Sequence, residues 1–244
     1  ISKLIDDSKQ TIMIIGTPLQ EENLLFNGAL VIQNRKLIAQ AKKQALPSYD
    51  VFDETRYFSS GNELCIFECG EKKFALAICE DLWVSAQKLH RESLYIKKQD
   101  PLEKLENNQV DGIISINASP FEIGKQKSRE AVLKQISKKY HLPVYYINQV
   151  GGQDSLIFDG NSFAVTTDQK MIYGKSFEED VLIVSSHSKL TEQNESEIAN
   201  IYHALILGCR DYFRKTGIQK AFLGLSGGIY SAVVAALAAE ALGS

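Results

Sequence analysis

The segment "FALAICEDLW", residues 74–83, indicates both the fold class and the chemistry of this chain. Its first five residues are apolar, as in a strand buried on both faces of a sheet, and the run stops at Cys79, two acids and a tryptophan. Such a strand holds the residue at its end rigidly, so that a reacting carbonyl group can reach the Cys79 thiol and the next backbone N–H can face a developing oxyanion. The alternative is a small buried thiol, since ten residues show no partner that activates it.

The composition is that of a globular protein. The 244 residues are 44% hydrophobic and 23% charged, enough to bury a core as one large domain or as one and a half smaller ones. A net charge of −3 gives no reason to expect a nucleic acid or an anionic membrane as partner. No 18-residue apolar span and no secretory leader is present, which favours a cytoplasmic protein. The four cysteines fit neither a zinc signature nor a disulfide framework: Cys65, Cys69, Cys79 and Cys209.

Strand and helix patterns alternate along the chain as far as residue 187. The strand patterns occupy 11–19, 24–33, 36–46, both sides of a Gly-centred turn in 63–79, 111–119, 143–150, two segments of 151–174, and 178–187. The helix patterns occupy 86–108, with Pro101 as a helix start, and 127–142. Many strands with intervening helices and no internal repeat predict a layered α/β domain over residues 1–187.

A second unit begins after a polar linker, residues 188–196. The pattern predicts an amphipathic helix that Gly217 ends, a buried parallel strand at 220–225, and a glycine loop that opens an Ala-rich helix. These pieces cannot enclose a core by themselves. Residues 197–244 are therefore expected to be the first part of a second domain.

Five segments carry a resemblance to a known family. The segments are "KQALPSYDVFDETRYF" (43–58), "AICEDLW" (77–83), "INASPFEIGKQKSRE" (116–130), "NQVGGQDSLIFDGNSF" (148–163) and "LGLSGGIYSA" (223–232). In that order they resemble the glutamine-dependent NAD synthetases: the first four their glutaminase domain, a branch of the nitrilase superfamily, and the fifth the start of their synthetase domain.

The resemblance implies a nitrilase-type four-layer α/β/β/α sandwich that hydrolyses glutamine to glutamate and ammonia. It also implies the first helix, strand, loop and helix of a Rossmann-like adenine-nucleotide-binding domain. In the family this second domain uses ATP and Mg²⁺ to adenylate nicotinic acid adenine dinucleotide, which the ammonia then converts to NAD. A homo-oligomer is expected as well.

The resemblance places the catalytic nucleophile on Cys79 and a catalytic lysine on Lys43 rather than Lys42. An ammonium group near Cys79 would lower the thiol pKa and stabilise the oxyanion, together with the N–H of Glu80. Spacing alone leaves the choice between the two adjacent lysines open. Glu54 resembles a second glutamate that many of these enzymes keep near the lysine, or it is a salt-bridge partner of Arg56.

Substrate contacts carry over to five positions. Tyr49, Glu80, Ser119 and Lys125 match residues that contact glutamine in the family, and Trp83 is placed to wall the pocket. A basic group suits a substrate that carries a carboxylate. The ordinary alternatives are a packed aromatic at Tyr49, a turn residue before a proline at Ser119 and a solvated cation at Lys125.

Two departures from the family bear on activity. The resemblance places the general-base glutamate on a strand that precedes this sequence, and Glu21 and Glu22 lie in the wrong segment to replace it. The chain alone is therefore expected to release little or no ammonia from glutamine, because general-base catalysis supplies roughly 10²–10⁴-fold.

The second departure lies in the glycine loop. Ser226, Gly227, Gly228 and Ser231 keep a cradle for ATP or pyrophosphate at a helix start, but Tyr230 stands where the family has aspartate. A phenol supplies no hard anionic ligand for Mg²⁺, so weak binding of ATP or pyrophosphate is expected. Tyr230→Asp in a chain with the full second domain is expected to recover magnesium-dependent adenylation.

The interpretation that unites these features is a fragment or degraded copy of a glutamine-dependent NAD synthetase. A freestanding amidase of the nitrilase superfamily would leave residues 197–244 unexplained. A catalytically inactive assembly module would fit the absent glutamate and Tyr230.

Overall fold

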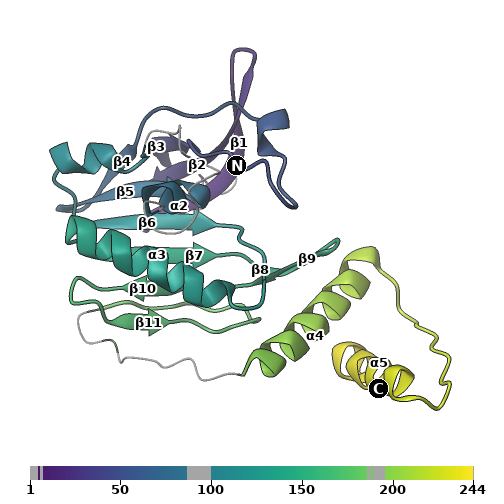
Figure 1. The fold of residues 1–244 in the computed structure, drawn as a ribbon. Helices are drawn as coiled ribbons and strands as arrows, with labels where there is room; N and C mark the ends of the chain where they lie inside the picture. Colours follow the sequence, from purple (N-terminus) through teal and green to yellow (C-terminus); the bar gives the residue numbers. More distant parts are fainter. Residues whose placement is uncertain (1–4, 6–7, 87–99, 186–187, 189–195, 244) are drawn as a thin grey trace. The chain divides into compact units, whose positions relative to one another are not determined.

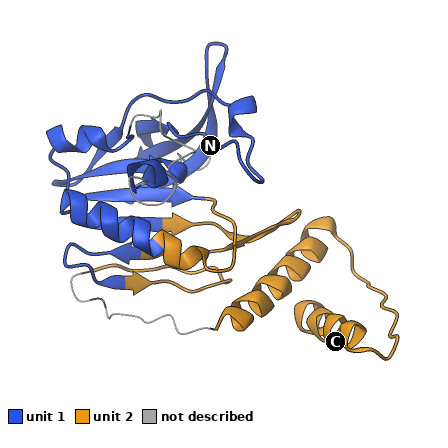
Figure 2. Cartoon of the chain, in the orientation of Figure 1, with its two compact units in different colours: residues 1–117, 130–146, 164–171 blue, residues 118–129, 147–163, 172–244 orange. Residues whose placement is uncertain are grey.

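A computed structural model describes residue 5 and residues 8–86, 100–185, 188 and 196–243. The described chain forms two compact units, each assembled from separate stretches of sequence (Figure 2). The first unit contains residues 1–117, 130–146 and 164–171, and the second contains 118–129, 147–163 and 172–244. The boundary between the units falls within three strands of one sheet, residues 144–148, 163–165 and 171–173.

The chain begins with an antiparallel three-stranded meander, as the sequence predicts. Strands β1 (Met13–Glu21), β2 (Leu24–Gln33) and β3 (Lys36–Lys42) pair in the order β1-β2-β3. The central strand buries one residue after another from Ala29 to Ile32, because it has a neighbour on each side and a packed face. The outer strands expose more of their residues: β1 alternates between half-buried and exposed positions from Ile15 onward, and β3 buries only Ala41.

A six-stranded sheet forms the centre of the fold, in the order β11-β10-β7-β6-β5-β4. Its strands are β4 (Cys65–Cys69), β5 (Lys72–Ile78), β6 (Gly112–Asn117), β7 (Val144–Asn148), β10 (Phe163–Val165) and β11 (Met171–Tyr173). Gly70 makes the β4–β5 turn with φ of 62°, which glycine adopts without strain. Because β5 and β6 run parallel inside the sheet, residues 75–78 are buried as predicted, while Phe74 at the start of the run is half-buried.

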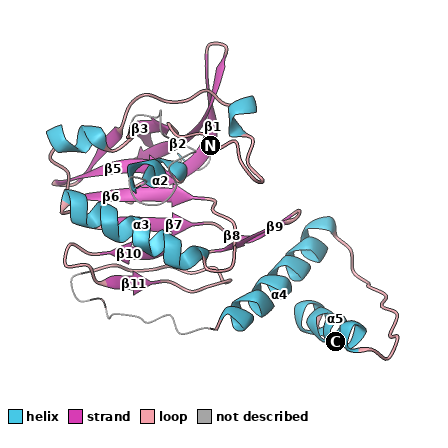
Figure 3. Cartoon of the chain, in the orientation of Figure 1, coloured by secondary structure: helices cyan, strands magenta, loops and turns pink. Residues whose placement is uncertain are grey.

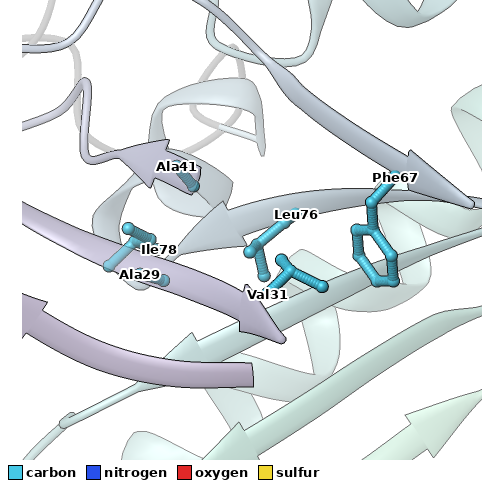
Figure 4. Packing of buried hydrophobic residues seen from close by; sticks show 6 residues of the cluster. All are labelled: Ala29, Val31, Ala41, Phe67, Leu76 and Ile78. Carbon is cyan, nitrogen blue, oxygen red and sulfur yellow. The ribbon is translucent and has the colours of Figure 1, made fainter. Parts of the chain in front are cut away.

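The two sheets of the first unit pack face to face. Ala29, Val31 and Ala41 of the meander form one core cluster with Phe67, Leu76 and Ile78 of β4 and β5 (Figure 4). Helix α3 (Lys125–Tyr140) lies across the other face of the six-stranded sheet (Figure 1) and buries Leu133 and Ile136. The described part of this unit therefore has three layers, α/β/β.

The helix pattern of 86–108 is described only in part, because residues 87–99 lie outside the described residues. A short helix, α2 (Glu80–Ala86), follows β5 directly, and a 3-10 helix, η2 (Glu103–Asn107), begins two residues after Pro101. Another 3-10 helix, η1 (Glu54–Arg56), lies in the loop after β3.

The second unit is built on a two-stranded hairpin, β8 (Val150–Gln153) with β9 (Leu156–Asp159). Residues 151–174 thus contain the end of β8 and three further strands, where the sequence predicted two. Helix α4 (Glu197–Thr216) packs its apolar face on Val150, Ile157, Phe121 and Phe177. Its ends agree with the prediction: the Ser196 hydroxyl accepts the Ala199 N–H, and Gly217 has φ of 72°.

Polar contacts also hold α4 to the hairpin. The Asp211 carboxylate accepts the Gly152 N–H at 2.9 Å, and the Lys215 ammonium donates to the Gly152 carbonyl at 2.5 Å. Gly152 and Gly208 let the backbones approach, since a Cβ on Gly152 would lie 3.0 Å from the Gly208 Cα. Residues 197–216 thus share a compact unit with the hairpin. The predicted domain boundaries stay a prediction, and most of the predicted linker lies outside the described residues.

Two predicted strands are wrong. Residues 178–185 and 220–225 have no strand conformation (Figure 3). Most of their apolar side chains are exposed, with Val181 at 85% and Phe222 at 96%. A strand is stable only when its N–H and C=O groups pair with a neighbour, and no described strand lies beside either segment. An apolar run alone therefore misled the prediction.

The Ala-rich helix is present as α5 (Ile229–Leu242), immediately after the glycine loop. Neither α4 nor any other helix in the described ranges is long and apolar enough to cross a membrane.

Candidate active site

Cys79 occupies the tight turn between β5 and α2. Its N–H donates to the Ile116 carbonyl at 3.0 Å, which continues the β5–β6 pairing by one residue, and its own carbonyl accepts the Leu82 N–H. Its φ is 47°, a left-handed conformation that is uncommon for a residue with a side chain. The side chain is half-buried. A strained, tightly bonded turn at the end of a buried strand is the position that the sequence predicted for a nucleophile.

Lys43 is buried and paired. Its side chain is 2% exposed, and its ammonium lies 2.5 Å from Glu54 Oε1. The Asn27 amide donates to the other Glu54 oxygen at 3.2 Å. A lysine is almost never buried unless it is paired, so this ammonium is held at one place in the interior.

The adjacent lysine has a different environment. Lys42 pairs with Glu21 at the surface, where both side chains are partly exposed. Arg56 lies 3.8 Å from Asp53, so it is the partner of Asp53, while Glu54 pairs with Lys43. The structure thus joins the two residues that the resemblance selected, Lys43 and Glu54. Their catalytic roles stay a prediction.

Two predicted substrate residues are also joined. The Tyr49 hydroxyl donates to Glu80 Oε1 at 2.8 Å, and Glu80 is 5% exposed at the first position of α2. Trp83 follows on the same helix and is half-buried. The first unit therefore holds Cys79 and most of its predicted companions.

Asp81 is a site residue that the sequence analysis did not select. Its side chain is 3% exposed and accepts three backbone N–H groups. Burial raises the pKa of Asp81 from 3.8 to about 6, although these hydrogen bonds and the Lys43 ammonium act in the opposite direction. The second acid of "CED" could have been noticed as a residue that has to be buried beside the strand end.

Asp81 makes stability depend on pH. Because its pKa is higher in the folded state than in the unfolded state, the stability that proton binding contributes at low pH is lost as the pH rises from 3.8 to about 6. Relative to the unmodified protein, Asp81→Asn is expected to gain about 2–3 kcal/mol between pH 4 and pH 7. Urea unfolding of both proteins at the two pH values measures this gain, and a difference that does not change with pH would contradict it.

The remaining predicted glutamine contacts lie in the second unit. The Ser119 N–H donates to Asn148 Oδ1 at 2.9 Å, and the Ser119 carbonyl and hydroxyl accept from Arg129. Arg129 is fully buried and pairs with Asp159 at 2.8 Å. Lys125, the first residue of α3, lies 3.2 Å from Glu122. That these residues meet the same substrate as Cys79 stays a prediction.

The glycine loop precedes α5 and is exposed. Gly227 has φ of 81°, Gly228 is the N-cap of α5, and the Ser231 hydroxyl donates to the Gly228 carbonyl at 3.0 Å. The Ser226 hydroxyl lies 3.2 Å from that of Ser231, and Tyr230 is 87% exposed. The first turn of α5 contains no acid, and the described residues contain no cluster suited to a metal ion. Mg²⁺ therefore does not fit this loop as it stands.

Two protein families match this sequence. The carbon-nitrogen hydrolase family matches residues 6–193. The chain belongs to the carbon-nitrogen hydrolase family. The NAD synthase family matches residues 201–244 of the same chain. The two family matches therefore follow one another in the order that the sequence motifs predicted.

Curated relatives align with this chain over nearly its whole length. It is 40% identical over 234 residues to a glutamine-dependent NAD(+) synthetase of Synechocystis sp., covering 92% of this chain and 41% of the relative. It is 36% identical over 249 residues to that of Acinetobacter baylyi, covering 98% and 43%. The chain thus spans about two fifths of the length of these curated relatives.

Solved structures give the same result for the fold. The glutamine-dependent NAD+ synthetase of Acinetobacter baumannii, in complex with adenosine diphosphate, aligns with a TM-score of 0.86 at 35% identity over 99% of this chain and 45% of that chain. A carbon-nitrogen hydrolase of Helicobacter pylori, at 20% identity and a TM-score of 0.57, covers 70% of this chain and 60% of that chain and shares the fold. The predicted nitrilase-type fold is confirmed.

Proposed function

We propose that this chain is the glutaminase part of a glutamine-dependent NAD synthetase, together with the start of its synthetase part. The observation that carries the proposal is the buried ion pair of Lys43 with Glu54 in the compact unit that holds Cys79 at a strand end. The match of residues 201–244 to the NAD synthase family favours this function over a freestanding amidase.

In the proposed reaction the Cys79 sulfur attacks the side-chain amide carbon of glutamine. The carbonyl oxygen becomes an oxyanion, which the Lys43 ammonium and the Glu80 N–H stabilise. The C–N bond then breaks as the leaving nitrogen takes up the proton that the Cys79 thiol gave up. Ammonia departs, and a thioester between Cys79 and the glutamyl group remains. Water cleaves this thioester to give glutamate and the free thiol. The resemblance places the carboxylate that accepts the thiol proton upstream of this sequence, so none of the described residues is assigned that role.

Glu54 has a separate part in this scheme. Its carboxylate bonds the Lys43 ammonium directly, and the Asn27 amide fixes its second oxygen. It therefore holds the lysine side chain in one orientation in the interior, where the lysine is 2% exposed. Ser119 and Lys125 are proposed to contact the glutamine, as the resemblance implies, with Arg129 holding Ser119 in place. The Lys125 cation suits a substrate that carries a carboxylate.

The ammonia is proposed to enter the ATP-dependent amidation of nicotinic acid adenine dinucleotide. The synthetase start supplies a glycine loop at a helix N-terminus, a feature that favours phosphate, but the first turn of its helix α5 has no carboxylate for Mg²⁺.

Isotope tracing tests the proposed function in the polypeptide at its natural length. With glutamine labelled with ¹⁵N at the side-chain amide, ATP and nicotinic acid adenine dinucleotide, the label is expected in the carboxamide of NAD. Unlabelled ammonia added at equal concentration is the control for exchange with free ammonia. Glutamate release without labelled NAD would point to an amidase alone, and release of neither product to an inactive module.

A further inference from the structure

One buried carboxylate joins the two segments that carry the candidate nucleophile and the candidate lysine. Asp81 Oδ1 accepts the N–H groups of Gln44 at 3.0 Å and Ala45 at 2.8 Å, and Asp81 Oδ2 accepts the Ile78 N–H at 3.1 Å. Gln44 and Ala45 directly follow Lys43, and Ile78 directly precedes Cys79. The two carboxylate oxygens of Asp81 therefore bond two backbone segments that are more than thirty residues apart in sequence.

The hydrophobic core fixes the same two segments only up to this point. Ala41 of β3 and Ile78 of β5 belong to one core cluster (Figure 4). Strand β3 ends at Lys42, and the Lys43 N–H makes one more bond, to the Asn27 carbonyl at 2.8 Å, before the chain leaves the sheet. Beyond Ile78 the chain turns through the strained Cys79. Carboxylate hydrogen bonds to backbone N–H groups are among the stronger ones. Asp81 thus adds the constraint where the sheet pairing ends.

We propose that Asp81 is a positioning residue that fixes the Lys43 backbone relative to the Cys79 turn. The inference rests on the proposed glutaminase function for its kinetic consequence. The hydrogen bonds of Asp81 to the two backbone segments are a property of the fold. A misplacement of about 1 Å in a reacting group can cost about 10²-fold in rate. Asp81 itself bonds only backbone groups and acts through Cys79 and Lys43.

The variant Asp81→Asn separates positioning from folding. An asparagine oxygen can still accept the N–H groups of Gln44 and Ala45, but its amide N–H₂ then faces the Ile78 N–H, which needs an acceptor. The variant also removes a charge that burial disfavours. The fold is therefore expected to persist, while the Cys79 turn loses its link to the lysine segment.

Two readouts test this variant in the polypeptide at its natural length. For glutamine hydrolysis, kcat is expected to fall about 10-fold to 10²-fold with KM within about twofold, because substrate groups are untouched. The rate of Cys79 alkylation by iodoacetamide, mapped by mass spectrometry, is expected to fall to a similar extent, while that of the exposed Cys69 stays the same.

Asp111→Asn is the matched control, since the Asp111 carboxylate also accepts a backbone N–H, that of Lys73 at 2.7 Å, but at the exposed start of β5. It is expected to change neither rate. If Asp81→Asn does not fold, Asp81→Glu replaces it. This variant keeps the buried charge but lengthens the side chain by one methylene, and the same losses are expected.

Unchanged Cys79 alkylation in the folded Asp81 variant would overturn the inference. A loss of kcat accompanied by an equal rise in KM would also overturn it, because it would indicate a general disturbance of the pocket. If the unmodified protein does not hydrolyse glutamine, the proposed function fails, but the alkylation rates still decide whether Asp81 positions Cys79.

Discussion

Replacing Cys79 by alanine is expected to lower glutamine hydrolysis by about 10⁴-fold or more, as loss of a hydrolase nucleophile does. Alanine retains the Cβ, so the half-buried turn at φ of 47° keeps its geometry and its N–H bond to Ile116. The variant removes only the sulfur, which is the proposed attacking atom and also packs against the core cluster. Glutamate release in the polypeptide at its natural length measures the effect.

Cys69→Ala is the matched control, because Cys69 is an exposed thiol at the end of β4. It is expected to leave the rate unchanged. Ammonia-dependent NAD formation should survive Cys79→Ala, since free ammonia bypasses the thioester. If glutamate release persists in Cys79→Ala, Cys79 is not the nucleophile and the proposed mechanism fails.

Replacing Lys43 by methionine is expected to lower kcat by about 10²–10³-fold, the loss that follows removal of one oxyanion stabiliser. Methionine fills a similar volume but carries no charge. It also leaves the Glu54 carboxylate, which is 16% exposed, without its ammonium partner, at a cost of about 3 kcal/mol of unfolding free energy. Steady-state kinetics and urea unfolding measure the two effects.

Two further variants separate the effect on catalysis from that on stability. Lys42→Met removes the adjacent surface cation, which pairs with Glu21, and is expected to change kcat less than twofold. Lys43→Met combined with Glu54→Gln removes the unpaired carboxylate, so stability should recover while kcat stays low. Recovery of kcat in the double variant would show that Lys43 serves the fold and not the reaction.

Much of the fold was predictable because the patterns are local. The meander, the β4–β5 hairpin, the buried β5 and β6, helix α3 and the capped helix α4 each follow from periodicity, turn glycines or a proline. Two apolar runs, 178–187 and 220–225, were misread because a strand also needs a neighbour, which no local pattern reveals. The end of β8 and the strands β9, β10 and β11 were undercounted because each strand is only three or four residues long, too short for a pattern that separates it from its neighbours.

The candidate site was predictable at its residues but not in its connections. The resemblance selected Lys43 over Lys42, and the structure shows which of the two is buried with Glu54. Asp81 was missed because its three partners are backbone N–H groups, which have no sequence signature.

Cys79 is proposed to be an activated nucleophile. Its labelling rate relative to the other three thiols, measured by mass-mapped alkylation of the folded protein at neutral pH, tests this. Burial raises the pKa of Cys65 to about 11, so this thiol should react slowly. Cys69 is exposed and supplies the rate of an accessible thiol. Cys79, although half-buried, is expected to be labelled faster than Cys69, Cys209 and Cys65. Labelling of Cys69, Cys209 or Cys65 ahead of Cys79 would contradict it.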